Sequence, residues 1–224
     1  MAGQMAFDLP LRAARGRADF FISPANAQAL AAIDTPEAWP QGRLLLRGPE
    51  GAGKSHLAGL WAEAQGAPTV SAEALQWADV PGLVAARAVL VEDGDAIGGQ
   101  PEAESALFHL HNLAAAEGAL LLLTATRAPR DWGLTLPDLA SRMAALPLAQ
   151  IEAPDDALLA AVLVKLFADR QVLVSPALIT WLVAHIDRSL AEVRQVVERL
   201  DAAALALGVP INRRLAQRVL DSGT

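Results

Sequence analysis

The sequence contains 224 residues with a hydrophobic fraction of 53%, which suits one medium-sized domain with a small second one and excludes a disordered chain. Its formal net charge of −7 removes the general attraction to phosphate backbones that non-specific nucleic-acid binding requires, so strong direct DNA binding is not expected. The chain has no cysteine, which excludes disulfides and thiolate metal sites and is typical of a reducing compartment.

The N-terminal residues 1–19 contain a basic segment, RAARGRA, and no continuous apolar core of the kind found in signal peptides. The densest apolar run of the chain, Ala119–Leu123, is far too short to cross a bilayer. We therefore expect a flexible leader over residues 1–19, no membrane partner and a cytoplasmic location.

Residues 20–152 show the alternation of strand and helix patterns that is typical of an α/β protein. The segment 20–33 predicts a turn followed by a helix, with Ser23 as the N-cap. A longer helix is predicted over 101–118, because it opens with Pro101 and acidic residues and stops at a glycine. Short apolar runs predict strands at 43–48, 67–72, 88–95 and 119–126. This order predicts a parallel sheet flanked by helices, with ligands bound beyond the carboxyl ends of the strands.

The pattern changes near residue 153, because only helical periodicity follows from Asp155 onward. The sequence therefore predicts three parts: a leader at 1–19, a nucleotide-binding core at 20–152 and a small all-helical lid domain at 153–224.

The segment GPEGAGKS satisfies the phosphate-loop pattern G-x-x-x-x-G-K-[ST] through Gly48, Gly53, Lys54 and Ser55, and it joins a predicted strand to a predicted helix. Glycines at this spacing let backbone N–H groups turn toward phosphates, and the start of the next helix adds its positive end. Lys54 is expected to reach the terminal phosphates and Ser55 to place its hydroxyl on Mg²⁺. The candidate nucleotide-binding residues are Pro49, Glu50, Gly51, Ala52, Gly53, Lys54, Ser55 and His56.

Two further strands end in polar residues at the same edge of the predicted sheet. The strand AVLV is followed by Glu92 and Asp93, and a carboxylate at this place in a phosphate-loop protein holds Mg²⁺, while its neighbour can orient the attacking water. The alternative is two solvated acids at a strand end. The strand LLLLTA ends near Thr126, where a hydroxyl would sense the γ-phosphate.

Several segments in the same order make the chain resemble the AAA+ domain of the bacterial replication initiator DnaA, and especially its shortened relatives of the Hda type, which switch the initiator off. FFISPANAQALAAI resembles the entry segment beside the adenine, FHLHNLAAAEGALLLLTATRAPRDW the helix–strand–sensor block, and LPDLASRMA the segment with the arginine finger. The resemblance runs from about residue 20 to residue 220. It implies a P-loop NTPase core of the AAA+ type with a helical lid, bound to ADP or ATP with Mg²⁺.

Residue by residue, the resemblance implies that Arg142 is an arginine finger, a charge offered to a nucleotide on a neighbouring molecule. Without the resemblance, Arg142 would be interpreted as an ordinary solvated arginine on a short helix. Phe21 and Ile22 would lie beside the adenine. The lid sensor arginine of DnaA has no direct counterpart, because Glu192 stands four residues after Arg188, and Arg194 is the nearest substitute.

Other departures from DnaA concern hydrolysis and DNA binding. Glu92 replaces the aspartate of DnaA, and its extra methylene moves the carboxylate, so this chain is expected to be a weak ATPase at most. The stretch between Ser71 and Val89 is shorter than the DnaA region with extra helices that bind single-stranded DNA. Since the sequence stops at Thr224, a C-terminal helix-turn-helix domain like that of DnaA is not expected.

The leader segment QMAFDL is similar to the peptides with which proteins dock on the polymerase sliding clamp. In such a peptide a glutamine amide binds at the mouth of a pocket and apolar side chains fill a groove. The corresponding residues are Gln4, Met5, Phe7 and Leu9. The alternative is a segment that packs on the domain's own surface.

Together these features predict a nucleotide-binding regulator of replication initiation that docks on the clamp and stimulates hydrolysis of ATP on DnaA. The sequence allows a homo-oligomer, and it does not decide whether ADP or ATP is the working ligand. One alternative is an autonomous ATPase or helicase-loader-like protein that grips single-stranded DNA, for which Arg213, Arg214 and Arg218 could form a patch. Another is a passive adaptor that bridges clamp and DnaA with no effect on hydrolysis.

Overall fold

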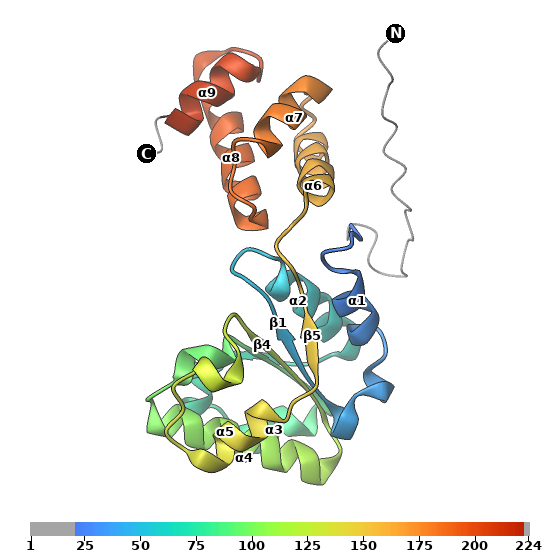
Figure 1. Ribbon diagram of the computed structural model, residues 1–224, viewed down its shortest axis with the longest axis vertical. Helices are drawn as coiled ribbons and strands as arrows, with labels where there is room; N and C mark the ends of the chain where they lie inside the picture. Colours follow the sequence, from blue (N-terminus) through green and yellow to red (C-terminus); the bar gives the residue numbers. More distant parts are fainter. Residues whose placement is uncertain (1–20, 222–224) are drawn as a thin grey trace.

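A computed structural model of the chain describes residues 21–221, and its central element is a five-stranded sheet (Figure 1). The strands are β1 (Arg43–Arg47), β2 (Thr69–Ser71), β3 (Ala88–Glu92), β4 (Leu120–Ala125) and β5 (Leu148–Gln150). They lie in the order β2-β3-β4-β1-β5, and every adjacent pair is parallel. The carboxyl ends of all five strands therefore lie along one edge of the sheet.

Helices cover both faces of the sheet because its strands are apolar on both sides. Leu45 of β1 packs in a core cluster with α3, α4 and α5, whereas its neighbours Leu44 and Leu46 pack on the opposite face in a cluster with α1 and α2. This alternation is the period of two that a strand imposes. The helices are α1 (Ala27–Ile33), α2 (Lys54–Gln65), α3 (Val80–Ala85), α4 (Pro101–Glu117) and α5 (Pro137–Ala144). Short 3₁₀ turns are η1 (Pro36–Ala38), η2 (Pro40–Gly42), η3 (Glu73–Trp77), η4 (Gly94–Ile97) and η5 (Pro129–Asp131).

The four predicted strands and the predicted helix α4 are confirmed. Helix α4 ends at Gly118, whose φ of 66° gives the left-handed C-cap that glycine favours. The fifth strand, β5, was not predicted. It has three residues, of which only Ala149 is buried, so it carries no strand pattern that could be recognised.

The N-cap prediction for Ser23 is wrong. Helix α1 begins at Ala27 with Asn26 at the N-cap position. Ser23 opens a preceding turn, in which its backbone N–H donates to Asn26 Oδ1 (3.0 Å) and its hydroxyl accepts from Ala25 N (3.2 Å). A serine before a proline satisfies the cap pattern and this turn equally well, because both use the same local side-chain bonds.

The C-terminal part of the described chain consists of helices α6 (Asp156–Asp169), α7 (Pro176–Val183), α8 (Leu190–Leu207) and α9 (Arg213–Asp221). They pack around their own apolar cluster, with Phe167, Leu182 and Leu200 fully buried. Side chains of Asp155, Ser175 and Ser189 cap α6, α7 and α8. These helices stand beyond the carboxyl edge of the sheet (Figure 1). Within residues 21–221, no helix combines the length and apolar character that a membrane crossing requires.

Replacing Phe167 by alanine is expected to destabilise the α6–α9 unit by about 3–5 kcal/mol, because the side chain is fully buried and its removal leaves a cavity. Chemical denaturation followed by circular dichroism measures the loss. The control is Leu173→Ala, which removes a side chain that is 99% exposed and should change stability by less than about 0.5 kcal/mol. Equal losses in the two variants would contradict the packing described here.

Candidate nucleotide-binding site

The loop between β1 and α2 has the conformation of a phosphate cradle. Gly53 stands at the N-cap of α2 with a φ of 101°, a left-handed value that a side chain would resist. Lys54 opens the helix, and its Nζ donates to Gly48 O (2.9 Å), Pro49 O (3.0 Å) and Thr126 Oγ1 (3.1 Å). Burial lowers the pKa of Lys54, and the nearby charge of Asp93 opposes that effect. The ammonium group is therefore held over the loop, where it can meet a phosphate.

The same loop contacts the start of α8, so the lid touches the cradle directly. Leu190 N donates to Gly51 O (2.8 Å). Gly51 has a φ of 71°, and a Cβ there would lie 1.9 Å from Ser189 Oγ. Ser189 in turn caps α8, since its hydroxyl accepts from Glu192 N (3.3 Å). We therefore expect a change in the loop's shape to alter the first turn of α8.

Replacing Gly51 by alanine is expected to weaken ADP binding by about tenfold or more, because the new methyl group displaces Ser189 and separates the lid from the loop. Isothermal titration calorimetry measures the affinity. Gly66→Ala is the matched control: Gly66 also has a positive φ (63°) but no atom within 4 Å of the added Cβ. It should lose about 1 kcal/mol of stability and keep its ADP affinity. Equal affinities in the two variants would contradict the coupling.

The carboxyl ends of β3 and β4 bring acidic and hydroxyl groups to the loop. Glu92 ends β3 and is half-buried, and the exposed Asp93 has a φ of 55° and donates its N–H to Thr124 Oγ1 (3.1 Å). Thr126 is exposed, and its hydroxyl accepts from Lys54 Nζ. Ser55 is exposed at the start of α2. Among residues 21–221 there is no cluster of three or more His, Cys, Asp or Glu side chains suited to a metal ion.

Sequence reasoning missed Asp95, a buried carboxylate beside these groups. Its oxygens accept from Thr126 N (3.2 Å), Arg127 N (3.0 Å) and Arg127 Nε (3.2 Å). Burial by itself would raise the pKa of Asp95, but the hydrogen bonds from Arg127 and Thr126 hold it below its ordinary value. The carboxylate is therefore ionised at neutral pH.

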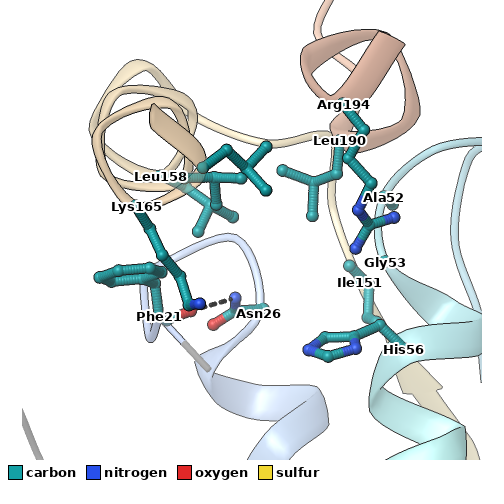
Figure 2. A pocket seen from close by; sticks show the side chains of 12 residues that line it. Phe21, Asn26, Ala52, Gly53, His56, Ile151, Leu158, Lys165, Leu190 and Arg194 are labelled. Atoms are coloured by element: carbon teal, nitrogen blue, oxygen red, sulfur yellow. Dashed lines mark hydrogen bonds between the residues drawn. The ribbon is translucent and has the colours of Figure 1, made fainter. Parts of the chain in front are cut away.

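A pocket of about 200 Å³ lies between the loop, α1 and the lid (Figure 2). Its lining residues are Phe21, Asn26, Ala52, Gly53, His56, Ile151, Leu158, Val162, Lys165, Leu166, Leu190 and Arg194. Figure 2 shows the Arg194 side chain pointing from α8 toward the loop, with Phe21 and Lys165 on the other side of the pocket. An apolar pocket with a few polar groups, next to a phosphate cradle, has the character of a base-binding site.

Some of the residues considered in the sequence do not line this pocket. Ile22 is not among the lining residues and packs on the cluster beneath α1 and α2. Pro49 and Glu50 are exposed on the loop itself, where the Pro49 carbonyl accepts from Lys54 Nζ (3.0 Å). Arg188 forms an ion pair with Asp156 (2.7 Å) at the base of the lid, outside the pocket. Gln4, Met5, Phe7 and Leu9 lie outside the described residues.

Arg142 lies at the amino edge of the sheet, opposite the phosphate loop. Helix α5 leads into β5 through Pro147, whose carbonyl accepts from Leu45 N (2.9 Å), whereas the loop follows the other end of β1. The exposed Arg142 guanidinium lies 5.3 Å from the centroid of the Phe108 ring on α4. Burial lowers the pKa of His111 to about 4, and the charges of Arg43 and Arg142 add to that shift. Arg142 therefore lies at the other end of the strands from its own phosphate loop.

No protein-family model matches the chain. Among solved structures, domain III of the replication initiation protein DnaA from Thermotoga maritima is similar, with a TM-score of 0.77, 19% identity and coverage of 91% of this chain and 94% of that one. The initiator DnaA bound to AMPPCP and single-stranded DNA gives a TM-score of 0.66 and 18% identity over 81% of this chain and 63% of that one. The FIGL-1 AAA domain in complex with ADP gives a TM-score of 0.61 and 19% identity over 81% of this chain and 69% of that one. The chain therefore has the P-loop AAA+ fold in the form seen in DnaA, and it spans less than two thirds of the DNA-bound initiator.

Proposed function

We propose that this chain binds an adenine nucleotide with Mg²⁺ and regulates replication initiation by stimulating ATP hydrolysis on DnaA. The phosphates would lie on residues 49–56 and the base in the pocket between Phe21, His56 and Arg194. Ser55 and Glu92 would hold Mg²⁺, since hydroxyl and carboxylate oxygens are the ligands it prefers. The bound nucleotide would fix the loop that contacts Ser189 and Leu190, and hence the lid.

One observation carries the regulatory part of the proposal. Arg142 is exposed at the amino edge of the sheet, and its own phosphate loop lies at the carboxyl edge. A cation in that position can meet only the nucleotide of another molecule. An arginine supplied in this way stabilises the charge of the transferring phosphoryl group. Together with the DnaA-like fold, this supports a finger that acts in trans.

The leader would bring the protein to its target. Gln4, Met5, Phe7 and Leu9 would dock on the sliding clamp, and a clamp loaded on DNA would raise the effective concentration of the regulator near the initiator. The chain itself would be a weak ATPase at most, since the bound nucleotide would serve to fix the conformation of the protein.

Phosphate release from ATP-loaded DnaA tests the proposal, with this protein added in ADP and with clamp loaded on DNA. Wild type is compared with a variant that lacks residues 4–9. Stimulation that requires both the clamp and the leader is the expected result. A protein that leaves DnaA unaffected but turns over ATP by itself would overturn the regulatory proposal.

A second candidate is a protein that grips single-stranded DNA, and the arginines of α9 favour it. Arg213, Arg214 and Arg218 are exposed, and none forms an ion pair within residues 21–221. Fluorescence anisotropy with a labelled single strand measures the binding. Nucleotide-dependent binding that falls in an Arg214→Ala/Arg218→Ala variant would favour this candidate over the regulator.

A further inference from the structure

The buried carboxylate of Asp95 joins two loops that are distant in sequence. It stands in the turn after β3 and accepts hydrogen bonds from the backbone of Thr126 and Arg127 in the turn after β4. It is 8% exposed, and three N–H donors satisfy its oxygens at 3.0–3.2 Å. Hydrogen bonds to a charged acceptor are the stronger kind, so this carboxylate fixes the relative position of the two turns.

The side chain of Arg127 adds further hydrogen bonds between the same two turns. Its guanidinium donates through Nε to Asp95 Oδ2, through Nη2 to Asp95 O, and through Nη1 to Asp131 O (3.1 Å). Its carbonyl accepts from Trp132 Nε1 (2.9 Å). Trp132 is 2% exposed, and its ring covers Gly94, where an added Cβ would lie 3.0 Å from it. Arg127, the residue after Thr126, is thus held by hydrogen bonds at both its backbone and its side chain.

Thr126 connects this cluster to the phosphate loop. Its N–H donates to Asp95 Oδ1, and its Oγ1 accepts from Lys54 Nζ at 3.1 Å. A diphosphate would be held by the loop itself. A third phosphate would extend from the loop toward the Lys54 ammonium and the tips of β3 and β4, where Thr126 presents its hydroxyl. The placement of this hydroxyl would therefore affect a triphosphate more than a diphosphate.

We propose that Asp95 and Arg127 are positioning residues that set the place of the Thr126 hydroxyl and thereby the discrimination between nucleoside triphosphate and diphosphate. The inference rests on the proposed nucleotide site and is independent of the action on DnaA. Asp95→Asn replaces one accepting oxygen by an N–H₂ group that faces backbone donors. Arg127→Ala removes the guanidinium and leaves the backbone bonds to Asp95 in place.

The test measures the Kd of ADP and of the non-hydrolysable analogue AMPPCP by isothermal titration calorimetry on the full chain. In Asp95→Asn and in Arg127→Ala, AMPPCP should bind about tenfold more weakly while the Kd of ADP changes by less than about twofold. Arg130→Ala is the matched control, because that arginine is 86% exposed and forms only a 3.6 Å ion pair with Asp131. It should leave both affinities unchanged.

A double-mutant cycle separates positioning from a general structural role. If Asp95 acts through Thr126, then Thr126→Val should weaken AMPPCP alone, and Asp95→Asn should add little to it. Additive losses, or equal losses of ADP and AMPPCP affinity in the variants, would overturn the positioning role while leaving the nucleotide site in place. A wild-type protein that binds neither nucleotide would overturn the proposed site and this inference with it. Arg127→Ala keeps the test decisive if Asp95→Asn does not fold.

Discussion

Replacing Lys54 by alanine is expected to weaken ADP binding by about 10- to 100-fold, the largest effect that we expect on the site of this chain itself. The ammonium is held over the loop by Gly48, Pro49 and Thr126, so a phosphate would meet a cation already in position. No other residue described on the loop supplies a positive charge there. The loss should therefore fall on affinity far more than on folding.

Thermal unfolding in the presence of ADP measures this effect together with calorimetry. At an ADP concentration 100 times the Kd, binding stabilises the wild type by about 2.7 kcal/mol, which raises the Tm by roughly 5–10 °C. With a Kd weakened 10- to 100-fold, the Lys54→Ala variant should be stabilised by only about 0.4–1.4 kcal/mol at the same concentration, so its Tm shift should be half that of the wild type or less. Arg47→Ala is the control, since Arg47 ends β1 just before the loop and donates to Gln150 Oε1 (2.8 Å). An unchanged shift in Lys54→Ala would show that the nucleotide binds elsewhere.

Replacing Arg142 by alanine is expected to abolish the stimulation of ATP hydrolysis on DnaA, because an arginine finger contributes about 10³–10⁵ to the rate. The affinity for ADP should stay unchanged, since Arg142 lies at the opposite edge of the sheet from the phosphate loop. Stability should fall by no more than about 1 kcal/mol, because the side chain is exposed and its contact with the Phe108 ring is worth about 0.5–1 kcal/mol. Single-turnover phosphate release from ATP-loaded DnaA measures the rate.

Two controls sharpen the Arg142 experiment. Arg214→Ala removes an exposed arginine from α9 and should leave stimulation intact. Phe108→Leu removes the ring beneath the Arg142 guanidinium, a contact of about 0.5–1 kcal/mol, and should lower stimulation only partly. Full stimulation by Arg142→Ala would show that Arg142 is not the arginine finger.

The parts of the fold and site that could be predicted from sequence are those that a short segment determines. Gly48 to Ser55 form a local motif, and Pro101 and Gly118 mark the ends of α4 by rules that involve only neighbouring residues. Strand β5 escaped prediction because its three residues become a strand only through pairing with β1.

The groups that were missed depend on contacts between distant segments. Asp95 meets Thr126 and Arg127 across 31 and 32 residues, and nothing around Asp95 in sequence marks it as buried. Lys165 lines the pocket only because the lid folds over the loop. Arg142 was singled out by resemblance alone, since an exposed arginine on a short helix has no local signature. Its position opposite the loop became visible only with the order of the strands.

We propose that the nucleotide bound to this chain fixes the conformation of the protein and that hydrolysis takes place on another molecule. Single-turnover hydrolysis with γ-labelled ATP tests it most directly, with the label placed first on DnaA and then, in a separate mixture, on this protein. We expect rapid release of labelled phosphate from the DnaA pool and slow release from the pool bound to this protein. Rapid release from this protein's own pool, with the DnaA pool unaffected, would contradict it.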